Sequence, residues 1–468
     1  MRSVLVLNFS QRSFILTDKC LLLSKNRFIF ILYFLKKNLY QNRMKNNPNQ
    51  KNSLRHVLFG SLIGTTIEFF DFYIYANAAV LVFPQLFFPG SDKTMATLES
   101  LATFSIAFLS RPLGSAFFGH YGDKIGRKFT LVAALLTMGI STVTIGFLPS
   151  YASIGVLAPL LLMLCRFGQG VGLGGEWGGA VLLAIENAPP HKRAWYGMFP
   201  QLGAPIGLLL SGGTFLLLTD SMSNEDFMNY GWRIPFIASS LLVVVGFYIR
   251  TKITETPSFE NSKNEHEEVK VPFFTLIKEY KNQLIFGTLA AITTFLVFYL
   301  MTVFTLSWAT SDLGYAKRDF LLIQMFSVLF FAAFIPVSAV VADKIGRRKI
   351  LIITTIAIAV FGFFFSHFLN SGSIFMVTFF VCLGMSLMGF TYGPLGTFLS
   401  ELFPTNVRYS GASLTFNLAG ILGAAFAPMI AIWLASTYSL TYVGFYLTIA
   451  ACISLFSLLV ISKKEHKF

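Results

Sequence analysis

Apolar stretches of about 20 residues recur along the whole sequence, and this recurrence limits the possible folds more than any other feature. A helix rises about 1.5 Å per residue, so about 20 residues cross a hydrocarbon layer about 30 Å thick. Only 12% of the 468 residues are charged, whereas soluble domains carry charge on about a quarter of their residues. The pattern predicts an all-α membrane protein.

The hydrophobic runs predict twelve transmembrane helices in two sets of six. The first set lies at 56–83, 98–118, 130–148, 155–185, 195–218 and 233–250, and the second at 284–309, 319–341, 350–368, 374–400, 411–434 and 440–461. A polar, charged segment separates the sets. We therefore expect a leader at 1–53, a six-helix bundle at 54–250, a linker at 251–282, a second bundle at 283–461 and a tail at 462–468.

The leader contains a second possible start of translation. Residues 1–43 are rich in Lys and Arg, and Met44 opens a short polar, basic segment that runs directly into the first predicted span. One hypothesis is that translation starts at Met44. A peptide from residues 1–43 in the mature protein would contradict this hypothesis.

Basic residues gather in alternate connections between the spans. Loops that carry an excess of Lys and Arg remain on the cytoplasmic side, so both termini and the linker are predicted to be cytoplasmic. The net charge of +14 is then explained by membrane orientation and not by nucleic-acid binding. The basic connections contain Lys124, Arg127 and Lys128; Lys192 and Arg193; Lys344, Arg347, Arg348 and Lys349; and, in the tail, Lys463, Lys464 and Lys467.

Two motifs repeat between the predicted halves. The segment GDKIGRK at 122–128 recurs as ADKIGRR at 342–348, after the second span of each set. After the fourth spans, Glu186 precedes Arg193 as Glu401 precedes Arg408, at the same separation of seven. Tandem halves with a solute site between them at mid-membrane are a plan of secondary transporters.

These segments resemble a known family. GHYGDKIGRK at 119–128 resembles the signature of the major facilitator superfamily. EFFDFY at 68–73, RPLG at 111–114, RFGQG at 166–170 and GGEWG at 174–178 are similar to its metabolite:proton symporter family. That resemblance covers about residues 54–462. It implies the major facilitator fold and a carrier of solutes such as citrate, 2-oxoglutarate, other dicarboxylates, shikimate, proline or betaine.

Away from the ends of the predicted spans, charged side chains are few, and we find them only in the first half: Glu68, Asp71, Arg111, Arg166 and Glu176. An ionised group near the bilayer centre costs about 2.5 to 3.5 kcal/mol on insertion scales. Each of these side chains is therefore expected to have a partner or a function. We expect Asp71 and Glu68 to couple transport to protons. Ionised Asp71 is predicted to pair with Arg111 or Arg166, and protonated Asp71 to release that Arg for a substrate carboxylate. A permanent ion pair that only fixes helix packing is the alternative.

The predicted substrate site combines these charges with polar and aromatic groups of both halves. A guanidinium grips a carboxylate through two parallel hydrogen bonds, so the expected cargo is a small organic solute, most simply a carboxylate-bearing metabolite. For Glu176, contact with solute or proton and structural hydrogen bonding are equally open. The expected substrate-binding residues are Arg111, Arg166, Gln169, Glu176, Tyr73, Tyr299, Tyr392 and Asn417.

The repeated loops are expected to form a latch that closes the cytoplasmic side, as the superfamily resemblance implies. Topogenic charge is the simpler alternative for some of these residues. The predicted gate residues are Asp123, Gly126, Arg127, Glu186 and Arg193, with Asp343, Arg347, Glu401 and Arg408. Glycines at 168–179 and 203–213 are predicted to let helices pack closely.

The sequence argues against several other classes. The sequence contains no GxxxxGK[ST] motif, which excludes an ATP-driven pump in this chain. No pair of His residues has the spacing of metal ligands. We expect no enzyme activity, cofactor, metal or obligate protein partner, with H+ as coupling ion and the cell membrane as location. An uncoupled facilitator or a non-transporting sensor with the same fold is the alternative. The direction of transport, uptake, follows only from the family resemblance.

Overall fold

The computed structural model describes residues 5–9, 12–16, 54–90, 92–125, 127–252, 272–405 and 407–461. The chain forms two units, Met1–Lys51 and Asn52–Phe468. In the first unit, β1 (Leu5–Phe9) and β2 (Arg12–Leu16) form an antiparallel hairpin with Leu5 opposite Leu16. The hydrophobic pattern does not predict this hairpin. Met44 lies outside the described residues.

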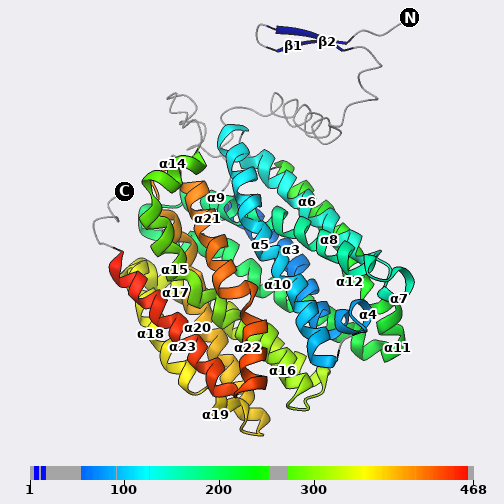
Figure 1. The fold of residues 1–468 in the computed structure, drawn as a ribbon. Helices are drawn as coiled ribbons and strands as arrows, with labels where there is room; N and C mark the ends of the chain where they lie inside the picture. The colour runs from blue at the N-terminus through cyan, green and yellow to red at the C-terminus, as the bar shows by residue number, and fades with distance from the viewer. Residues whose placement is uncertain are drawn as a thin grey trace, which may run out of the picture. The chain divides into compact units, whose positions relative to one another are not determined.

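The second unit is a bundle of helices in its described part (Figure 1). Its first half, residues 54–252, contains α3 (Leu54–Leu81), α4 (Phe83–Phe87), α5 (Lys93–Ile125), α6 (Arg127–Gly146), α7 (Tyr151–Ile154), α8 (Leu157–Gly174), α9 (Trp177–Glu186), η1 (Pro190–Lys192), α10 (Arg193–Ser221), α11 (Asn224–Asp226), η2 (Phe227–Gly231) and α12 (Arg233–Lys252).

The second half, residues 272–461, follows the same order of long helices. It contains α14 (Pro272–Glu279), α15 (Lys281–Tyr299), η3 (Leu300–Phe304), α16 (Thr305–Ser311), α17 (Lys317–Ile345), α18 (Arg347–Phe363), α19 (Phe365–Leu369), α20 (Ile374–Glu401), α21 (Arg408–Gly420), η4 (Ile421–Ala425), α22 (Ala427–Thr437) and α23 (Leu440–Val460). We call the end of the bundle where α12 ends and α14 begins the linker end, at the top of Figure 1.

Ten helical segments of the described residues are long and apolar enough to cross a membrane. The other two predicted spans are occupied by α3 and α18. Helix α18 has only 17 residues. Helix α3 contains Glu68, Asp71 and Asn77, which lower its hydropathy. Each predicted span therefore coincides with helical structure, although two of them lack the length or the hydropathy of a typical span.

Besides the breaks at Val82 and Phe364, which lie close to span ends, three predicted spans are not continuous α-helices. The span predicted at 155–185 is interrupted at Gly175 and Glu176, between α8 and α9. The spans predicted at 284–309 and 411–434 contain the π-helical turns η3 and η4. Such turns occur frequently at functional sites. All three interruptions lie close to residues predicted to bind substrate.

Glycines bring helices of the first half close together, as predicted. A Cβ at Gly174 of α8 would lie 2.7 Å from the Cα of Arg111 in α5. A Cβ at Gly207 of α10 would lie 2.7 Å from the backbone nitrogen of Phe70 in α3. No Cβ fits at such distances, so these glycines fix α5 and α3, the helices that carry Arg111 and Glu68. The halves then meet through contacts of α10 with α17 and of α5 with α21.

Candidate functional site

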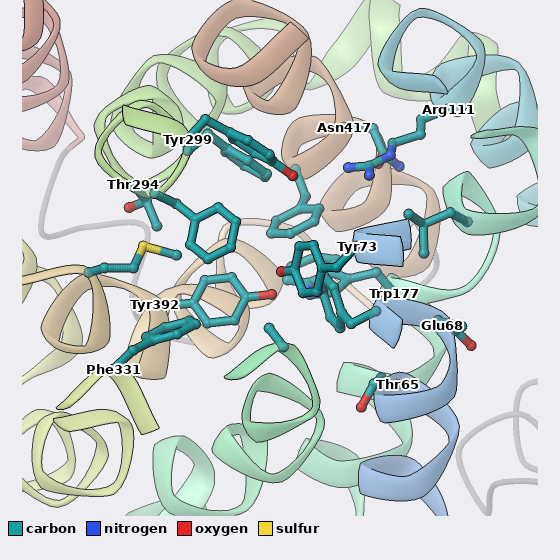
Figure 2. Close-up of a pocket in the computed structure, with 17 residues that line it drawn as sticks. Thr65, Glu68, Tyr73, Arg111, Trp177, Thr294, Tyr299, Phe331, Tyr392 and Asn417 are labelled. Atoms are coloured by element: carbon teal, nitrogen blue, oxygen red, sulfur yellow. The ribbon is translucent and has the colours of Figure 1, made fainter. Parts of the chain in front are cut away.

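A small cavity lies where the two halves meet (Figure 2). About 30 Å³ of it is open to the centres of water molecules, which is room for water but not for a metabolite. Side chains of both halves therefore fill most of the space between them. Of the ten residues predicted for proton coupling and substrate binding, six line the cavity: Glu68, Tyr73, Arg111, Tyr299, Tyr392 and Asn417.

Arg111 supplies the positive charge of the cavity wall. Its side chain is 4% exposed, and its guanidinium lies over the rings of Phe72 and Phe108, 4.6 and 4.2 Å from their centroids. No carboxylate of the described residues forms an ion pair with it, and its Nε has no hydrogen-bond partner there. The aromatic faces hold the cation by the attraction of their quadrupoles. Its remaining donors are thereby left for an anion.

The second half faces Arg111 with hydroxyl and amide groups. Tyr299 lies beside the guanidinium, and the hydroxyl groups of Tyr73, Tyr299 and Tyr392 point into the cavity (Figure 2). Asn417 donates to Ser115 Oγ at 2.6 Å, across the boundary between the halves. The π-helical turns begin one residue after Tyr299 and four residues after Asn417. This wall therefore offers neutral hydrogen-bonding groups around a single fixed cation.

Asp71 and Arg166 do not line the cavity, and the predicted pairing of Asp71 with Arg111 or Arg166 is not made in this structure. Ser239 Oγ donates to Asp71 at 2.5 Å. Arg166 instead lies 4.0 Å from the centroid of the Tyr75 ring and also over Phe72 and Phe104. Aromatic faces surround the Arg166 guanidinium, whose Nε and Nη2 have no hydrogen-bond partner among the described residues, and a hydroxyl holds the Asp71 carboxyl.

A series of side-chain contacts still connects Asp71 with Arg166. Arg166 donates to Gln169 Oε1 at 2.8 Å, and Gln169 Nε2 donates to Thr142 Oγ1 at 2.8 Å. Thr142 lies beside the Asp71 carboxyl. Gln169 was predicted to bind substrate, but here it bridges Arg166 and Thr142 behind the cavity wall.

Glu68 and Glu176 share a cation that the sequence did not single out. Arg250, near the end of α12, contacts the carboxylates of both residues through Nη2. The three side chains are at most 6% exposed. Arg250 Nη1 also donates to the carbonyl of Leu131 at 2.5 Å. In Figure 2 the Glu68 side chain extends from the cavity wall away from the tyrosines.

Part of the predicted gate lies at the linker end and joins the halves. Asp343 accepts hydrogen bonds from the backbone of Ala194 at 3.0 Å and of Trp195 at 2.9 Å, at the start of α10. Arg347 pairs with Asp343 at 3.0 Å and with Glu401 at 3.6 Å, and Arg193 lies 4.0 Å from Glu401. These contacts join residues predicted to form the latch of the second repeat, and their role as a gate stays a prediction.

The other predicted gate residues are placed less completely. Arg408 donates to the carbonyl of Phe403 at 3.1 Å, within its own half. Glu186 ends α9. Gly126 lies outside the described residues, as do the side chains of Asp123 and Arg127. The latch of the first repeat therefore stays a prediction.

Aromatic stacking closes the cavity between its tyrosines and the latch. Trp177 of α9 and Phe416 of α21 stack with their centroids 3.6 Å apart and their planes 8° from parallel. Trp177 Nε1 donates to Gln201 Oε1 at 2.9 Å, and Gln201 Nε2 donates to the Tyr392 carbonyl at 2.9 Å. At the opposite end, Arg318 pairs with Asp220 at 3.0 Å, again between the halves. Contacts between the halves therefore lie toward both ends of the bundle.

A helical bundle in two halves with repeated motifs, packed around a buried cavity that has the cation Arg111 on its wall, defines a membrane carrier of small solutes. Residues 61–428 match the family model described as Major Facilitator Superfamily, and the chain belongs to that superfamily. It is a multi-pass membrane transport protein and not an enzyme.

Relatives of known name agree with this class. The chain is 54% identical to the inner membrane metabolite transport protein YhjE of Escherichia coli strain K12, over 89% of this chain and 96% of that protein. It is 34% identical to the shikimate transporter of the same strain, over 88% of this chain and 95% of that protein. The solved proton:xylose symporter XylE shares its fold with a TM-score of 0.69 at 18% identity, over 87% of this chain and 94% of that chain.

Proposed function

We propose that this protein takes up a small carboxylate-bearing metabolite together with a proton, by alternating access of one cavity to the two sides of the membrane. The observation that carries the proposal is Arg111. It is a buried cation on the cavity wall without a carboxylate partner among the described residues. A carboxylate bound there completes two charge-assisted hydrogen bonds.

The shape of the site favours a solute with hydroxyl groups as well as a carboxylate. Tyr73, Tyr299, Tyr392 and Asn417 surround the place next to Arg111 with neutral donors and acceptors. Shikimate, which the name of one relative specifies, has this combination. Buried polar groups favour a ligand that pairs with all of them, because an unpaired donor or acceptor costs about 1 to 3 kcal/mol.

Asp71 is the group we propose to carry the coupling proton, with Glu68 beside it on α3. Asp71 is 1% exposed and accepts from Ser239. The relay through Thr142 and Gln169 connects it to Arg166. A change of charge at Asp71 therefore alters the balance of charge beside Arg166. Coupling requires that proton and solute favour the same conformation.

The remaining assignments follow from charge placement and relatives. The basic loops lie at the linker end, so we place that end, and both termini, in the cytoplasm. YhjE is named an inner membrane protein, and we propose the corresponding cell membrane for this chain. The coupling ion is H+, and transport requires no cofactor, nucleotide or protein partner.

Uptake by purified protein in liposomes tests this function. Shikimate, 2-oxoglutarate, citrate, proline and betaine are each offered with and without an inwardly directed proton gradient. We expect the gradient to drive at least one carboxylate above its external concentration. Equilibration without accumulation supports the uncoupled facilitator instead, and absence of any uptake supports the sensor. Loss of uptake in Arg111→Gln is compared with Lys281→Gln, which removes an exposed cation of the second half and serves as the control.

A further inference from the structure

The contact of one guanidinium with two buried carboxylates is not explained by packing. We propose that Glu68, Glu176 and Arg250, here called the buried triad, form a proton-binding site in which the two carboxyl groups share one proton. We further infer that this site passes its proton toward the linker end during transport. The second part rests on the proposed proton-coupled function, whereas the first does not.

Charge balance is the first argument. With both carboxylates ionised, the buried triad carries a net charge of −1 in a place where the side chains are at most 6% exposed. An uncompensated charge away from water is among the most costly features of a protein interior. One proton on either carboxyl makes the triad neutral.

The closeness of the two carboxylates is the second argument. Both contact the same nitrogen, Nη2 of Arg250, so their oxygens lie within about 6 Å of each other, twice a hydrogen-bond length. Two carboxylates at this separation repel each other, and such pairs hold one proton between them. Titration therefore belongs to the pair and not to one residue.

The surroundings of Glu176 supply a third, independent observation. Both oxygens of its carboxyl are buried without a hydrogen-bond donor in the described structure, apart from the ion contact with Arg250. Glu176 is the N-cap residue of α9, yet its side chain caps no backbone N–H. A purely structural ion pair with Arg250 requires one carboxylate, and Glu68 already supplies it. The Glu176 carboxyl therefore has Arg250, which it shares with Glu68, and no further partner among the described residues.

The other groups around the triad do not neutralise it. Tyr409 of α21 is the titratable group that acts on Arg250 from the second half, and its hydroxyl donates to the Gly175 carbonyl. From α6 the contact is the neutral carbonyl of Leu131. Asp71 lies one turn further along α3 and is held by Ser239 of α12. No further cation of the described side chains pairs with Glu68 or Glu176.

The position of the triad suits a proton that leaves toward the linker end. Glu68 lines the cavity, whereas Arg250 reaches Leu131, four residues after the start of α6. Four helical residues correspond to about 6 Å along the axis. The triad therefore spans the region between the solute cavity and the side where transport is proposed to end. Since Tyr409 bonds to the backbone next to Glu176, movement of α21 alters this region directly.

Infrared spectroscopy of the purified full-length protein in liposomes tests the proton site without any solute. At neutral pH, wild type is expected to show the band of a protonated carboxyl, shifted when H2O is replaced by D2O. The band should disappear in Glu68→Gln and in Glu176→Gln alike, because each leaves one carboxylate balanced by Arg250. Asp71→Asn should retain this band, and Glu225→Gln, which replaces an exposed carboxylate, is the matched control.

Some outcomes would overturn the proposal. Absence of the band in wild type contradicts a shared proton, and so does a band that neither Gln variant changes. If a Gln variant does not fold, Glu176→Asp keeps the carboxyl on a shorter side chain, and the band should then shift; an unshifted band contradicts the proposal. A band in wild type without gradient-driven uptake would remove the coupled function and keep the proton site. Coupled uptake together with a band that neither Gln variant changes would keep the coupled function and remove the proton site.

Discussion

The two halves of the bundle repeat each other's motifs but differ in what they bury. The first half buries six charged side chains: Glu68, Asp71, Arg111, Arg166, Glu176 and Arg250. In the described part of the second half, the buried polar side chains are all neutral residues such as Thr294, Gln324 and Asn417. One half therefore holds the charges, and the other supplies aromatic faces, hydroxyls and amides.

This division matters for a carrier whose halves move relative to each other. The buried charges lie on α3, α5, α8 and α12 and at the junction of α8 with α9, all within the first half. They can remain paired while the halves rock, so no buried ion pair has to break at mid-membrane. Among the described residues no ion pair crosses the cavity region; the contacts that cross it include Asn417 to Ser115, Trp177 to Phe416 and the Arg111 guanidinium to Tyr299. The cost of opening is thereby kept low.

Removal of the proposed proton carrier should have the largest effect on transport. We expect Asp71→Asn to abolish proton-driven accumulation while solute exchange between the two sides continues, because Asn keeps a partner for Ser239 but cannot lose a proton. Asp319→Asn, an exposed carboxylate of the second half, should leave accumulation intact. Persistent accumulation by Asp71→Asn would assign the coupling proton to another group.

The second prediction compares guanidinium groups of the two halves. Arg250→Met leaves Glu68 and Glu176 buried without a cation, and loss of one partner of a buried pair costs about 3 to 5 kcal/mol of stability. Arg348→Met removes hydrogen bonds of 2.6 and 2.8 Å to the last carbonyls of α23, worth about 0.5 to 1.5 kcal/mol each. Thermal unfolding in detergent measures both changes. Equal losses would contradict the difference between the halves.

Most of the fold follows from the sequence, because a lipid-spanning helix has to satisfy its own backbone and therefore shows its length as an apolar run. Each predicted span coincides with helical structure, and the repeated ADKIGRR motif places Asp343 in contact with the start of α10 in the other half. The interruption at Glu176 and the turns η3 and η4 are not visible in hydropathy. A single inserted residue leaves the apolar pattern unchanged.

The site is predicted less completely than the fold, for physical reasons. Residue types identify Arg111 and the tyrosines, since a buried cation and polar rings are rare inside a bilayer. Arg250 was missed because a basic residue at the end of a span resembles ordinary orientation charge. The absence of a cation partner for Glu68 and Glu176 was the available signal. The separation of Asp71 from Arg166 depends on ring positions that spacing does not determine.

The third prediction concerns solute affinity. Arg111→Gln should weaken binding of the transported carboxylate by about 10- to 150-fold, because a hydrogen bond to a charged group contributes about 1.5 to 3 kcal/mol. Arg111→Lys keeps the charge but cannot form the bidentate contact, so its affinity for the carboxylate should lie between those of wild type and Arg111→Gln. Quenching of Trp177 fluorescence, from the same cavity, reports binding. An unchanged affinity in Arg111→Gln would place the carboxylate elsewhere.

The smallest effect should come from the neutral wall. Tyr299→Phe removes one hydroxyl beside Arg111 and should weaken binding by about 2- to 12-fold, the range for a neutral hydrogen bond of about 0.5 to 1.5 kcal/mol. Tyr442→Phe, an exposed tyrosine of the same half, is the control. A loss as large as that of Arg111→Gln would show that the second half contributes as much as the charged half.

Simultaneous recording of solute and proton entry tests the account most directly. Liposomes containing the protein and a trapped pH-sensitive dye are given the carboxylate that the uptake panel identifies, without an imposed gradient. The account predicts that the lumen acidifies as the solute enters, and that Arg111→Gln and Asp71→Asn each remove the acidification. Solute entry in wild type with no change of lumen pH would contradict it.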